Sequence, residues 1–326
     1  MGKYVAKRLL LFIPLMFGIM LIIFLLFKLA PGDPLSGMMD PKISADRRMQ
    51  LRALWGLDKS IPEQFFIWLK NILQGDFGSS FKYSKPVLSV INDYIWNSFI
   101  LALPATILSF VIAIPLGVLS ATKQYSLYDN TMTVFAMVGI SVPSFFFILL
   151  MMKYFGVDWK ILPISGMRTA TADYTGPRLW LDIAWHMVIP LTVYVFASVA
   201  SLMRYVRSSM LEVIRQDYIR TARSKGLKER VVIYKHALAN AMIPTITLLG
   251  LSLAGLFVGG LITESICQWP GIGKVSYDAV IARDYNLLMG YNVLLSFLTL
   301  LGNLLADLAY ALVDPRVRLG GGSASR

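Results

Sequence analysis

Six uninterrupted runs without a charged residue most constrain what this 326-residue chain can fold into. Each run contains about 19 residues or more, which is enough for a helix to cross a hydrocarbon core about 30 Å thick. A buried helix of a soluble protein explains one such run but not six. The runs cover residues 9–27, 98–122, 130–152, 183–203, 237–263 and 285–306. We therefore predict an all-α integral membrane protein with six transmembrane helices.

The composition agrees with this class. Hydrophobic residues make up 56% of the chain and charged residues only 15%, whereas a soluble domain has about 25% charged residues. The first run is too long for a cleaved signal peptide, and no small-residue cleavage site follows it, so we expect a retained first helix. Cys267 is the single cysteine, which excludes an intrachain disulfide and argues against a cysteine-based metal site.

The predicted division of the chain follows these runs. In the external region, the stretches 44–55 and 61–73 carry apolar residues at helical spacing, and Pro62 suits the first turn of the second helix. We predict an N-terminus with the first span (1–29), an external helical region (30–96), a five-helix core (97–313) and a tail (314–326). Within the core, the predicted spans are 97–122, 130–154, 183–203, 237–263 and 285–311, with a long polar loop at 204–236.

The positions of Lys and Arg set the expected orientation, because cytoplasmic loops are enriched in both. The segment 204–235 alone carries nine basic residues. The cations of the long external stretch are nearly balanced by acids, and long translocated loops obey the charge rule weakly. Both termini are therefore predicted to be cytoplasmic. The net charge of +12 fits this topology and anionic lipid, since no aromatic and basic RNA-binding pattern is present.

The motifs of common enzymes are missing from the sequence. The segment 270–274 resembles a phosphate-binding loop, but Gln268 and Val275 occupy positions where that loop requires Gly and Ser or Thr. No HExxH, GxSxG or CxxC motif occurs. His186 and His236 have no partner at metal-ligand spacing. We therefore predict no catalytic residue and no metal site on this chain.

Acidic residues at mid-membrane depth would indicate an ion-coupled carrier. None of the six spans carries one, which disfavours a proton- or sodium-driven carrier, although ion sites built from backbone carbonyls would escape this test. Energy must then come from a partner, or the protein is a passive channel. Both alternatives remain open on this ground alone.

The loop after the fourth run favours a partner. A helix is expected to start near Ser208, and a short helix is expected over 218–224, closed by Gly226. Topology alone requires only about two or three cations in a loop. This loop carries nine, together with residues that are typical of the start and the end of a helix. A plain lipid-binding loop is the alternative, and docking to a cytoplasmic protein is the favoured interpretation.

The same loop carries a family resemblance. The segment DYIRTARSKGL at 217–227, followed by HALANAMIP at 236–244, resembles the coupling loop of binding-protein-dependent ABC importer permeases. It is most similar to the first permease subunit of the oligopeptide/dipeptide/nickel family. Arg220, Thr221 and Ala239 depart from the wider superfamily, which has Glu, Ala and Pro there, but these departures are typical of the peptide subfamily. Other matching fragments are APGDP at 30–34, GDFG at 75–78, SVPSF at 141–145, WPGIG at 269–273 and DPRVR at 314–318.

The resemblance implies a type I importer in a bacterial or archaeal plasma or inner membrane. A second homologous permease would complete the pathway, two ATPase subunits would bind ATP and Mg²⁺, and an external or periplasmic binding protein would deliver the cargo. This chain would bind no cofactor and perform no chemistry. The implied cargo is a di- or oligopeptide; nickel or another metal chelate, glutathione or an opine are alternatives, and an ion-coupled carrier or channel is the less favoured class.

The resemblance also implies roles for individual residues. One group is expected to contact the ATPase, with Arg220 and Arg223 as anchors on its acidic or backbone groups. A second group is expected to face the binding protein or to form an external gate. The ATPase-coupling residues are Asp217, Tyr218, Arg220, Thr221, Ala222, Arg223 and Gly226, and the receptor-facing or gate residues are Gly32, Asp33, Glu264 and Trp269.

Overall fold

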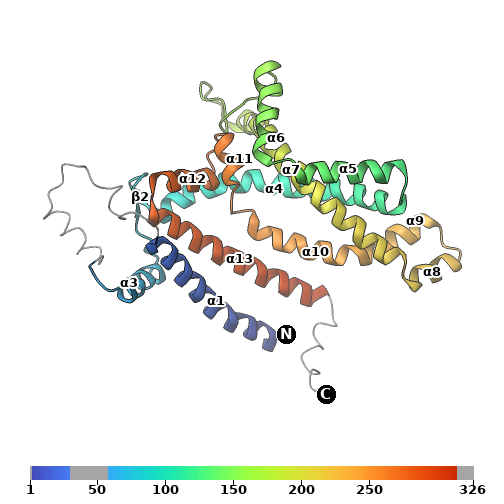
Figure 1. Cartoon of the computed structure of the whole chain (residues 1–326), viewed down its shortest axis with the longest axis horizontal. Coiled ribbons are helices and arrows are strands. Elements are labelled where there is room, and N and C mark those ends of the chain that lie inside the picture. Colours follow the sequence, from blue (N-terminus) through green and yellow to red (C-terminus); the bar gives the residue numbers. More distant parts are fainter. Residues whose placement is uncertain (1, 30–57, 314–326) are drawn as a thin grey trace.

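The computed structural model describes residues 2–29 and 58–313. Within these ranges the chain is mostly helical and elongated (Figure 1). Five helices are long and apolar enough to cross a membrane, and six spans result if one bent pair of helices is counted as a span. The predicted helical membrane fold is therefore confirmed. The long helices are α1 (Gly2–Leu29), α4 (Val87–Thr122), α7 (Gly176–Ile214), α10 (Leu238–Gly255) and α13 (Tyr285–Val313).

Helices α4 and α7 form the centre of the fold and pack against each other over much of their length. Gly117 brings them together most closely, because a Cβ atom there would lie 2.8 Å from the carbonyl oxygen of Met203 and from Cβ of Val206. Small residues permit such close helix contact in a membrane. Helix α13 lies between α10 and α1 (Figure 1). Phe12 and Phe297 pack edge to face across the α1–α13 contact, with ring centroids 5.8 Å apart.

The third predicted span is broken. Helix α5 (Leu127–Ser141) is followed by α6 (Ser144–Met151) and the π-helical turn η1 (Met152–Asp158), and the chain bends by 99° between them. The expectation of one continuous helix over 130–154 is therefore wrong. Pro143 is the cause, since a residue before proline is disfavoured in the helical region and Val142 is extended, with ψ of 120°.

Several other helix ends differ from the sequence prediction. Helix α4 begins at Val87 rather than at 97, and α7 begins at Gly176 rather than at 183, because both helices extend beyond their apolar runs. Helix α10 ends at Gly255, and α11 (Leu261–Ile266) begins after a turn in which Gly259 has a φ of +68°. The run 237–263 is therefore not one helix. Helix α7 continues to Ile214 without a new start at Ser208. The charge of Arg204 ends the apolar run, but it does not end the helix.

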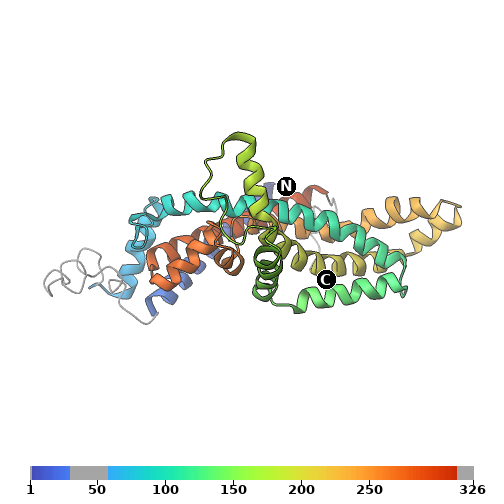
Figure 2. The same ribbon diagram turned by 90° about the horizontal axis from the view of Figure 1, so that it is seen from above.

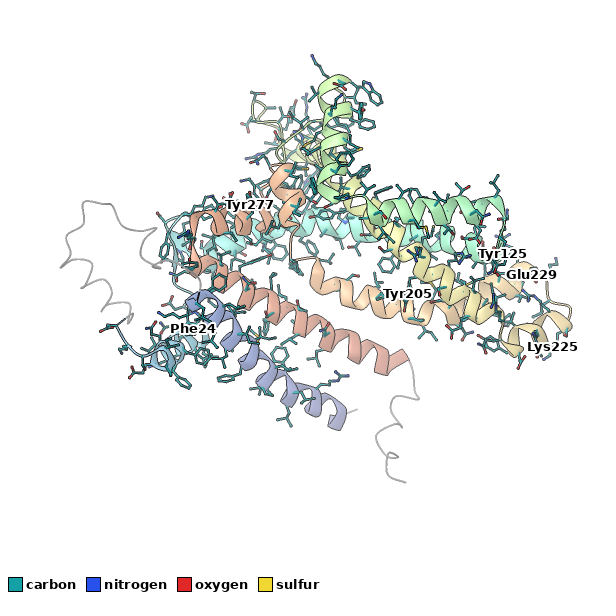
Figure 3. All side chains as sticks on the ribbon, viewed as in Figure 1. Phe24, Tyr125, Tyr205, Lys225, Glu229 and Tyr277 are labelled. Atoms are coloured by element: carbon teal, nitrogen blue, oxygen red, sulfur yellow. The ribbon has the colours of Figure 1, made fainter. Side chains whose placement is uncertain are left out.

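The polar region before α4 contains the predicted helix α3 (Ile61–Leu73), whose bounds are confirmed. Ser60 precedes it in a capping box: the Ser60 backbone N–H and hydroxyl both donate to the Glu63 carboxylate, at 3.1 and 3.0 Å. Such a box satisfies backbone donors at the start of a helix. Phe65 packs edge to face against Phe24 of α1 (labelled in Figure 3) and fixes α3 against the first span. The helix predicted over 44–55 lies outside the described residues.

A small hairpin connects this region to the segment between α12 and α13. Strands β1 (Ser79–Ser80) and β2 (Lys85–Pro86) pair antiparallel just before α4. Asp284, which follows α12 (Ile272–Ala282) and is fully buried, accepts hydrogen bonds from the Ser80 hydroxyl at 2.5 Å and the Lys82 backbone N–H at 3.2 Å. We call this part of the molecule the α12 end.

The opposite part of the molecule is formed by the loop after α7. It contains α8 (Asp217–Ser224), the single turn α9 (Glu229–Val231) and the π-helical turn η2 (Val232–Ala237), which leads into α10. Figures 1 and 2 show α8 and α9 at the far tip of the elongated molecule, away from β2 and α12. We call this part the α8 end.

The close packing around Gly273 at the α12 end predicts that one added methyl group at this residue destabilises the protein. A Cβ atom on Gly273 would lie 2.8 Å from Oε2 of Glu264 and from the backbone carbon of Gly260. Gly273→Ala should therefore destabilise the protein by about 1–3 kcal/mol, as overpacking does, and lower the thermal unfolding midpoint in detergent. Gly18→Ala is the matched control, because no atom lies within 4 Å of its added Cβ. Equal midpoints for the two variants would contradict the packing at Gly273.

Candidate functional site

Helix α8 is anchored to the membrane-spanning helices by its apolar face. Ile219 is fully buried and Ala222, one turn later, is 7% exposed. Both belong to one buried apolar cluster that includes Val206 of α7 and Val232 of η2. Burying a side chain such as Ile219 contributes about 1.5–3 kcal/mol. Helix α8 is therefore fixed firmly to the end of α7, since interiors pack tightly and deform little.

The other face of α8 is exposed and carries positive charge. Tyr218, Arg220 and Thr221 are all exposed. Arg220 forms a loose pair with Asp217 one turn earlier, with 3.7 Å between Nη1 and Oδ1 and both side chains mostly exposed. An exposed pair of this kind contributes little to stability. Arg220 can therefore exchange Asp217 for a carboxylate on another protein at little cost.

Arg223 is held within the loop. Its guanidinium donates two hydrogen bonds to Glu229, from Nε to Oε2 at 3.1 Å and from Nη2 to Oε1 at 2.7 Å. This bidentate pair closes the connection between α8 and α9, and the Glu229 carboxylate raises the pKa of Arg223. Two parallel charge-assisted bonds fix geometry as well as energy. Arg223 therefore shapes the loop, and its expected contact with a partner remains a prediction.

Gly226 ends the helix as the sequence predicts. Its φ is +74°, a conformation that residues with a side chain rarely adopt, and its N–H donates to the Arg223 carbonyl at 2.9 Å. No atom lies within 4 Å of the position a Cβ would take. The requirement for glycine at this position is therefore conformational rather than steric.

A buried ion pair next to this loop escaped the sequence analysis. Asp129 at the start of α5 is only 2% exposed, and Arg207 on α7 donates to both of its oxygens, from Nε at 2.6 Å and from Nη2 at 2.7 Å. Asp129 also accepts hydrogen bonds from the Ser120 hydroxyl and from the Tyr125 backbone N–H. We call these four residues the Asp129 clamp.

The clamp joins three membrane-spanning elements at the α8 end. Ser120 belongs to α4, Tyr125 to the turn after it, Asp129 to α5 and Arg207 to α7. Figure 3 labels Tyr125 close to Glu229, with Lys225 further out at the same tip. The buried cluster that holds Ile219 also includes Val118 and Ala121 of α4. The Asp129 clamp and α8 therefore contact the same ends of α4 and α7.

The expected gate residues Glu264 and Trp269 lie inside the α12 end, 1% and 0% exposed. The Ser98 hydroxyl donates to Glu264 at 2.7 Å, and the backbone N–H of Gly273 donates to it at 2.8 Å. Burial raises the pKa of Glu264, although these hydrogen bonds act in the opposite direction. Both residues thus tie α11 and the start of α12 to α4, and their role in a gate remains a prediction.

Trp269 provides a further connection between α4 and the segment that precedes α12. Its indole Nε1 donates to the Asn97 carbonyl at 2.9 Å, while the Asn97 side chain donates to the Pro270 carbonyl at 2.7 Å. Neither Glu264 nor Trp269 offers surface to another protein in this conformation. The other two expected residues, Gly32 and Asp33, lie outside the described residues.

The described residues contain no group of three or more His, Cys, Asp or Glu side chains that could hold a metal ion. Two ion pairs near α8 join separate elements: Arg207 of α7 pairs with Asp129 of α5, and Arg223 of α8 pairs with Glu229 of α9.

Comparison with known proteins identifies the family. Residues 113–319 match the family described as "Binding-protein-dependent transport system inner membrane component", and residues 1–109 match the N-terminal component of the same kind of system. The chain belongs to this family. It is a multi-pass permease subunit of an ABC transporter, in which separate ATPase subunits hydrolyse ATP. The sequence-based recognition is thereby confirmed.

Similar permeases cover nearly the whole chain. The oligopeptide transport system permease protein AppB of Bacillus subtilis is 41% identical over 318 residues, which is 97% of this chain and 99% of AppB. The dipeptide transport system permease protein DppB of Escherichia coli K12 is 36% identical over 336 residues, covering 98% of this chain and 99% of DppB. The chain therefore spans nearly the whole length of both relatives.

The fold also resembles a solved transporter. A chain of the MetNI methionine ABC transporter superposes with a TM-score of 0.54 at 16% identity, covering 70% of this chain and 97% of that one. At this identity the likeness concerns the fold alone. It supports the permease architecture of the described helices.

The Asp129 clamp predicts a large stability effect from one side chain. Removing one partner of a buried ion pair costs about 3–5 kcal/mol, because the other charge is left uncompensated. Asp129→Ala should therefore lower the thermal unfolding midpoint of the purified permease markedly. Asp158→Ala is the matched control, since it breaks an exposed pair with Lys153 at 2.6 Å that is worth about 1 kcal/mol at most.

The double variant Asp129→Ala/Arg207→Ala tests the cause. It removes both charges and should recover part of the lost stability, which appears as coupling in a double-mutant cycle. Strictly additive effects of the two substitutions would show that the pair does not act as a unit.

Proposed function

We propose that this permease imports di- or oligopeptides that an external binding protein delivers. The single observation that carries this cargo is the full-length similarity to AppB and DppB, named as oligopeptide and dipeptide permeases. The di/tripeptide permease DppB of Pseudomonas aeruginosa is also 35% identical over 98% of this chain. The chain itself performs no chemistry and moves cargo by changing conformation.

The proposed assembly has four further subunits or partners. A second homologous permease completes the pathway, two ATPase subunits bind ATP and Mg²⁺, and a peptide-binding protein docks on the outside. This chain holds no cofactor of its own. The family description, which names dependence on a binding protein, supports this assembly.

The proposed orientation places the α8 end in the cytoplasm, with both termini on that side. The density of Lys and Arg between residues 204 and 235 supports it. Helix α1 begins and α13 ends toward the same side of the molecule (Figure 1), as paired cytoplasmic termini require. The α12 end, with α3 and the hairpin, then faces the binding protein.

In the proposed mechanism, α8 sits in a cleft of one ATPase and works as a lever. Closure of the two ATPases on ATP moves α8, and the buried contacts of Ile219 and Ala222 carry this movement to α7. The Asp129 clamp then carries it from α7 to the ends of α4 and α5. Rigid-body rocking of such a helix group against a second permease opens the pathway on alternate sides.

The exposed residues of α8 have separate roles in this proposal. Arg220 provides the charge that contacts acidic or carbonyl groups of the ATPase, while Tyr218 and Thr221 flank it on the exposed face. Asp217 holds Arg220 in place before docking. Ala222 and Gly226 keep the lever packed and terminated, and Arg223 braces it against Glu229.

Transport by the reconstituted complex tests the function. Proteoliposomes that contain both permeases and both ATPases, with peptide-binding protein on the outside, should accumulate a radiolabelled tripeptide only when ATP is supplied on the α8 side. Uptake of Ni²⁺ chelates or glutathione in place of peptides would reject the cargo. Uptake without ATP would reject the transporter class.

Charge reversal on α8 tests the lever. Arg220→Glu should reduce the ATPase activity that the loaded binding protein elicits by about tenfold or more, because losing a charge-assisted contact of about 1.5–3 kcal/mol and adding repulsion weakens docking. Arg178→Glu is the matched control: it reverses an exposed charge at the other end of α7, where Arg178 lies over the Tyr174 ring. Stimulated ATPase activity that survives Arg220→Glu would refute the anchor role.

A further inference from the structure

A largely open cavity of about 490 Å³ lies between α4, α7 and α10, within the span region rather than at either end. Its volume falls within the range of small-molecule sites in proteins, about 300–1,000 Å³. Six hydroxyl groups line it, from Thr106, Ser109, Ser198, Ser201, Tyr205 and Ser252. Figure 3 labels Tyr205 where α7 passes α10.

The spacing of these residues gathers them on one face of each helix. Thr106 and Ser109 are three residues apart on α4, and Ser198, Ser201 and Tyr205 follow at intervals of three and four on α7. Residues at these intervals lie on the same side of a helix. A polar stripe on α4, a polar stripe on α7 and Ser252 of α10 thus meet in a region where the sequence is otherwise apolar, and polar groups within a membrane characteristically face a pathway or the protein interior.

Four of the six hydroxyl protons in this cavity are already used. Ser109 donates to the Ala105 carbonyl at 2.7 Å and Ser252 to the Leu248 carbonyl at 2.8 Å. Thr106 donates to the Ala102 carbonyl at 2.9 Å and Ser201 to the Ala197 carbonyl at 3.4 Å. A hydroxyl that donates to its own helix keeps lone pairs that can only accept. These four side chains therefore present acceptors to the cavity.

Charge is missing from the lining. None of the described residues around the cavity is ionisable at neutral pH, and the remaining lining residues are Phe110, Leu202 and Leu248. A group of neutral acceptors binds hydrogen-bond donors weakly and without regard to side-chain charge. Conduction through a pathway requires binding of this kind, favourable enough for entry and weak enough for release.

We infer that this hydroxyl cavity is a stopping point of the imported peptide, where the serine and threonine oxygens accept hydrogen bonds from the peptide's backbone N–H groups. This inference rests on the proposed peptide cargo and names how the permease would recognise it. Every peptide bond except one that precedes proline carries such a donor, whatever the side chains are. The site would thus bind a feature common to nearly all cargo, and leave selection among peptides to other parts of the system.

The test compares tri-alanine with an analogue in which both peptide nitrogens carry methyl groups and therefore cannot donate. Uptake into proteoliposomes of the complete complex is measured below half-saturation, for the wild type and for Ser109→Ala/Ser201→Ala/Ser252→Ala. The wild type and the triple variant are assayed with the same binding protein. Its own preference for one peptide therefore cancels when the ratio of the two uptake rates is compared between the wild type and the variant.

We expect the triple variant to take up tri-alanine at least about tenfold more slowly, since each lost hydrogen bond is worth about 0.5–1.5 kcal/mol. Uptake of the methylated peptide should change less than about twofold. An equal loss for both peptides, or no loss for either, would overturn the inference. If the wild type takes up neither peptide, the proposed function fails and this inference fails with it.

Ser296→Ala is the matched control. Ser296 on α13 donates to the Asn292 carbonyl at 2.7 Å in the same manner but does not line the cavity. Its replacement should leave the preference for tri-alanine over the methylated peptide unchanged. A loss of this preference in Ser296→Ala would show that the effect is not specific to the cavity.

Photo-cross-linking locates the peptide independently of any rate. A tripeptide with a central photoleucine keeps all its N–H donors and should label residues 198–205 and 248–252 during turnover with ATP. Labelling confined to α13 or α1 would place the peptide elsewhere. Cross-linking of a Ser201→Cys variant to the second permease in every nucleotide state would show that the cavity is a subunit contact, and this too would overturn the inference. Cys267 is only 3% exposed and adds little background.

Discussion

The negative charge of Asp129 is the constraint on which the α8 end depends. A carboxylate that is 2% exposed is stable only if its oxygens are paired, and here one guanidinium, one hydroxyl and one backbone N–H provide the pairing. These partners come from α4, the turn after it and α7, so satisfying one charge fixes three elements together. An apolar contact would tolerate sliding of the helices. A bidentate ion pair does not, because its geometry is directional.

Each end of the molecule contains a buried carboxylate whose hydrogen bonds join several helices. At the α8 end a buried carboxylate joins α5 to α4 and α7, and at the α12 end Glu264 joins α11 and α12 to α4. Helix α4 takes part in both. Between the two ends, the cavity is lined by hydroxyl groups and apolar side chains. In the proposed mechanism, a long helix with firm attachments at each end and neutral contacts between them transmits the movement that alternating access requires.

Local features of this structure could be predicted from the sequence because their causes are local. The start of α3 follows from Ser60 and its capping box, and α8 ends just before Gly226, where the turn requires a positive φ. The break of the third span at Pro143 could also have been predicted, since the effect of proline on the preceding residue is local. The prediction gave more weight to the apolar run than to Pro143. Hydropathy indicates whether a segment suits a lipid environment, but it does not indicate whether the helix is continuous.

The long-range contacts could not be predicted in the same way. Asp129 and Arg207 are 78 residues apart, and Ser98 and Glu264 are 166 residues apart, so no spacing rule connects them. One distant feature did leave a signal in the sequence. The hydroxyl residues at 198, 201 and 205 repeat at helical intervals within or next to an apolar run, and polar residues in that pattern mark the side of a helix that faces away from lipid.

The separation of strong and weak contacts has a consequence for the transport cycle. Charged pairs hold the ends because a fixed geometry must survive each turnover, and Arg223 with Glu229 does this even for the exposed loop. The cavity, in contrast, contains no charge among its described lining residues, so cargo of either sign meets no deep electrostatic trap. If a lysine or an aspartate lined it, peptides of opposite charge would bind several kcal/mol more tightly in that low-dielectric site and leave it correspondingly slowly. A neutral, acceptor-lined path avoids that penalty, which is the physical reason that a carrier of chemically varied peptides benefits from hydroxyl groups at its centre.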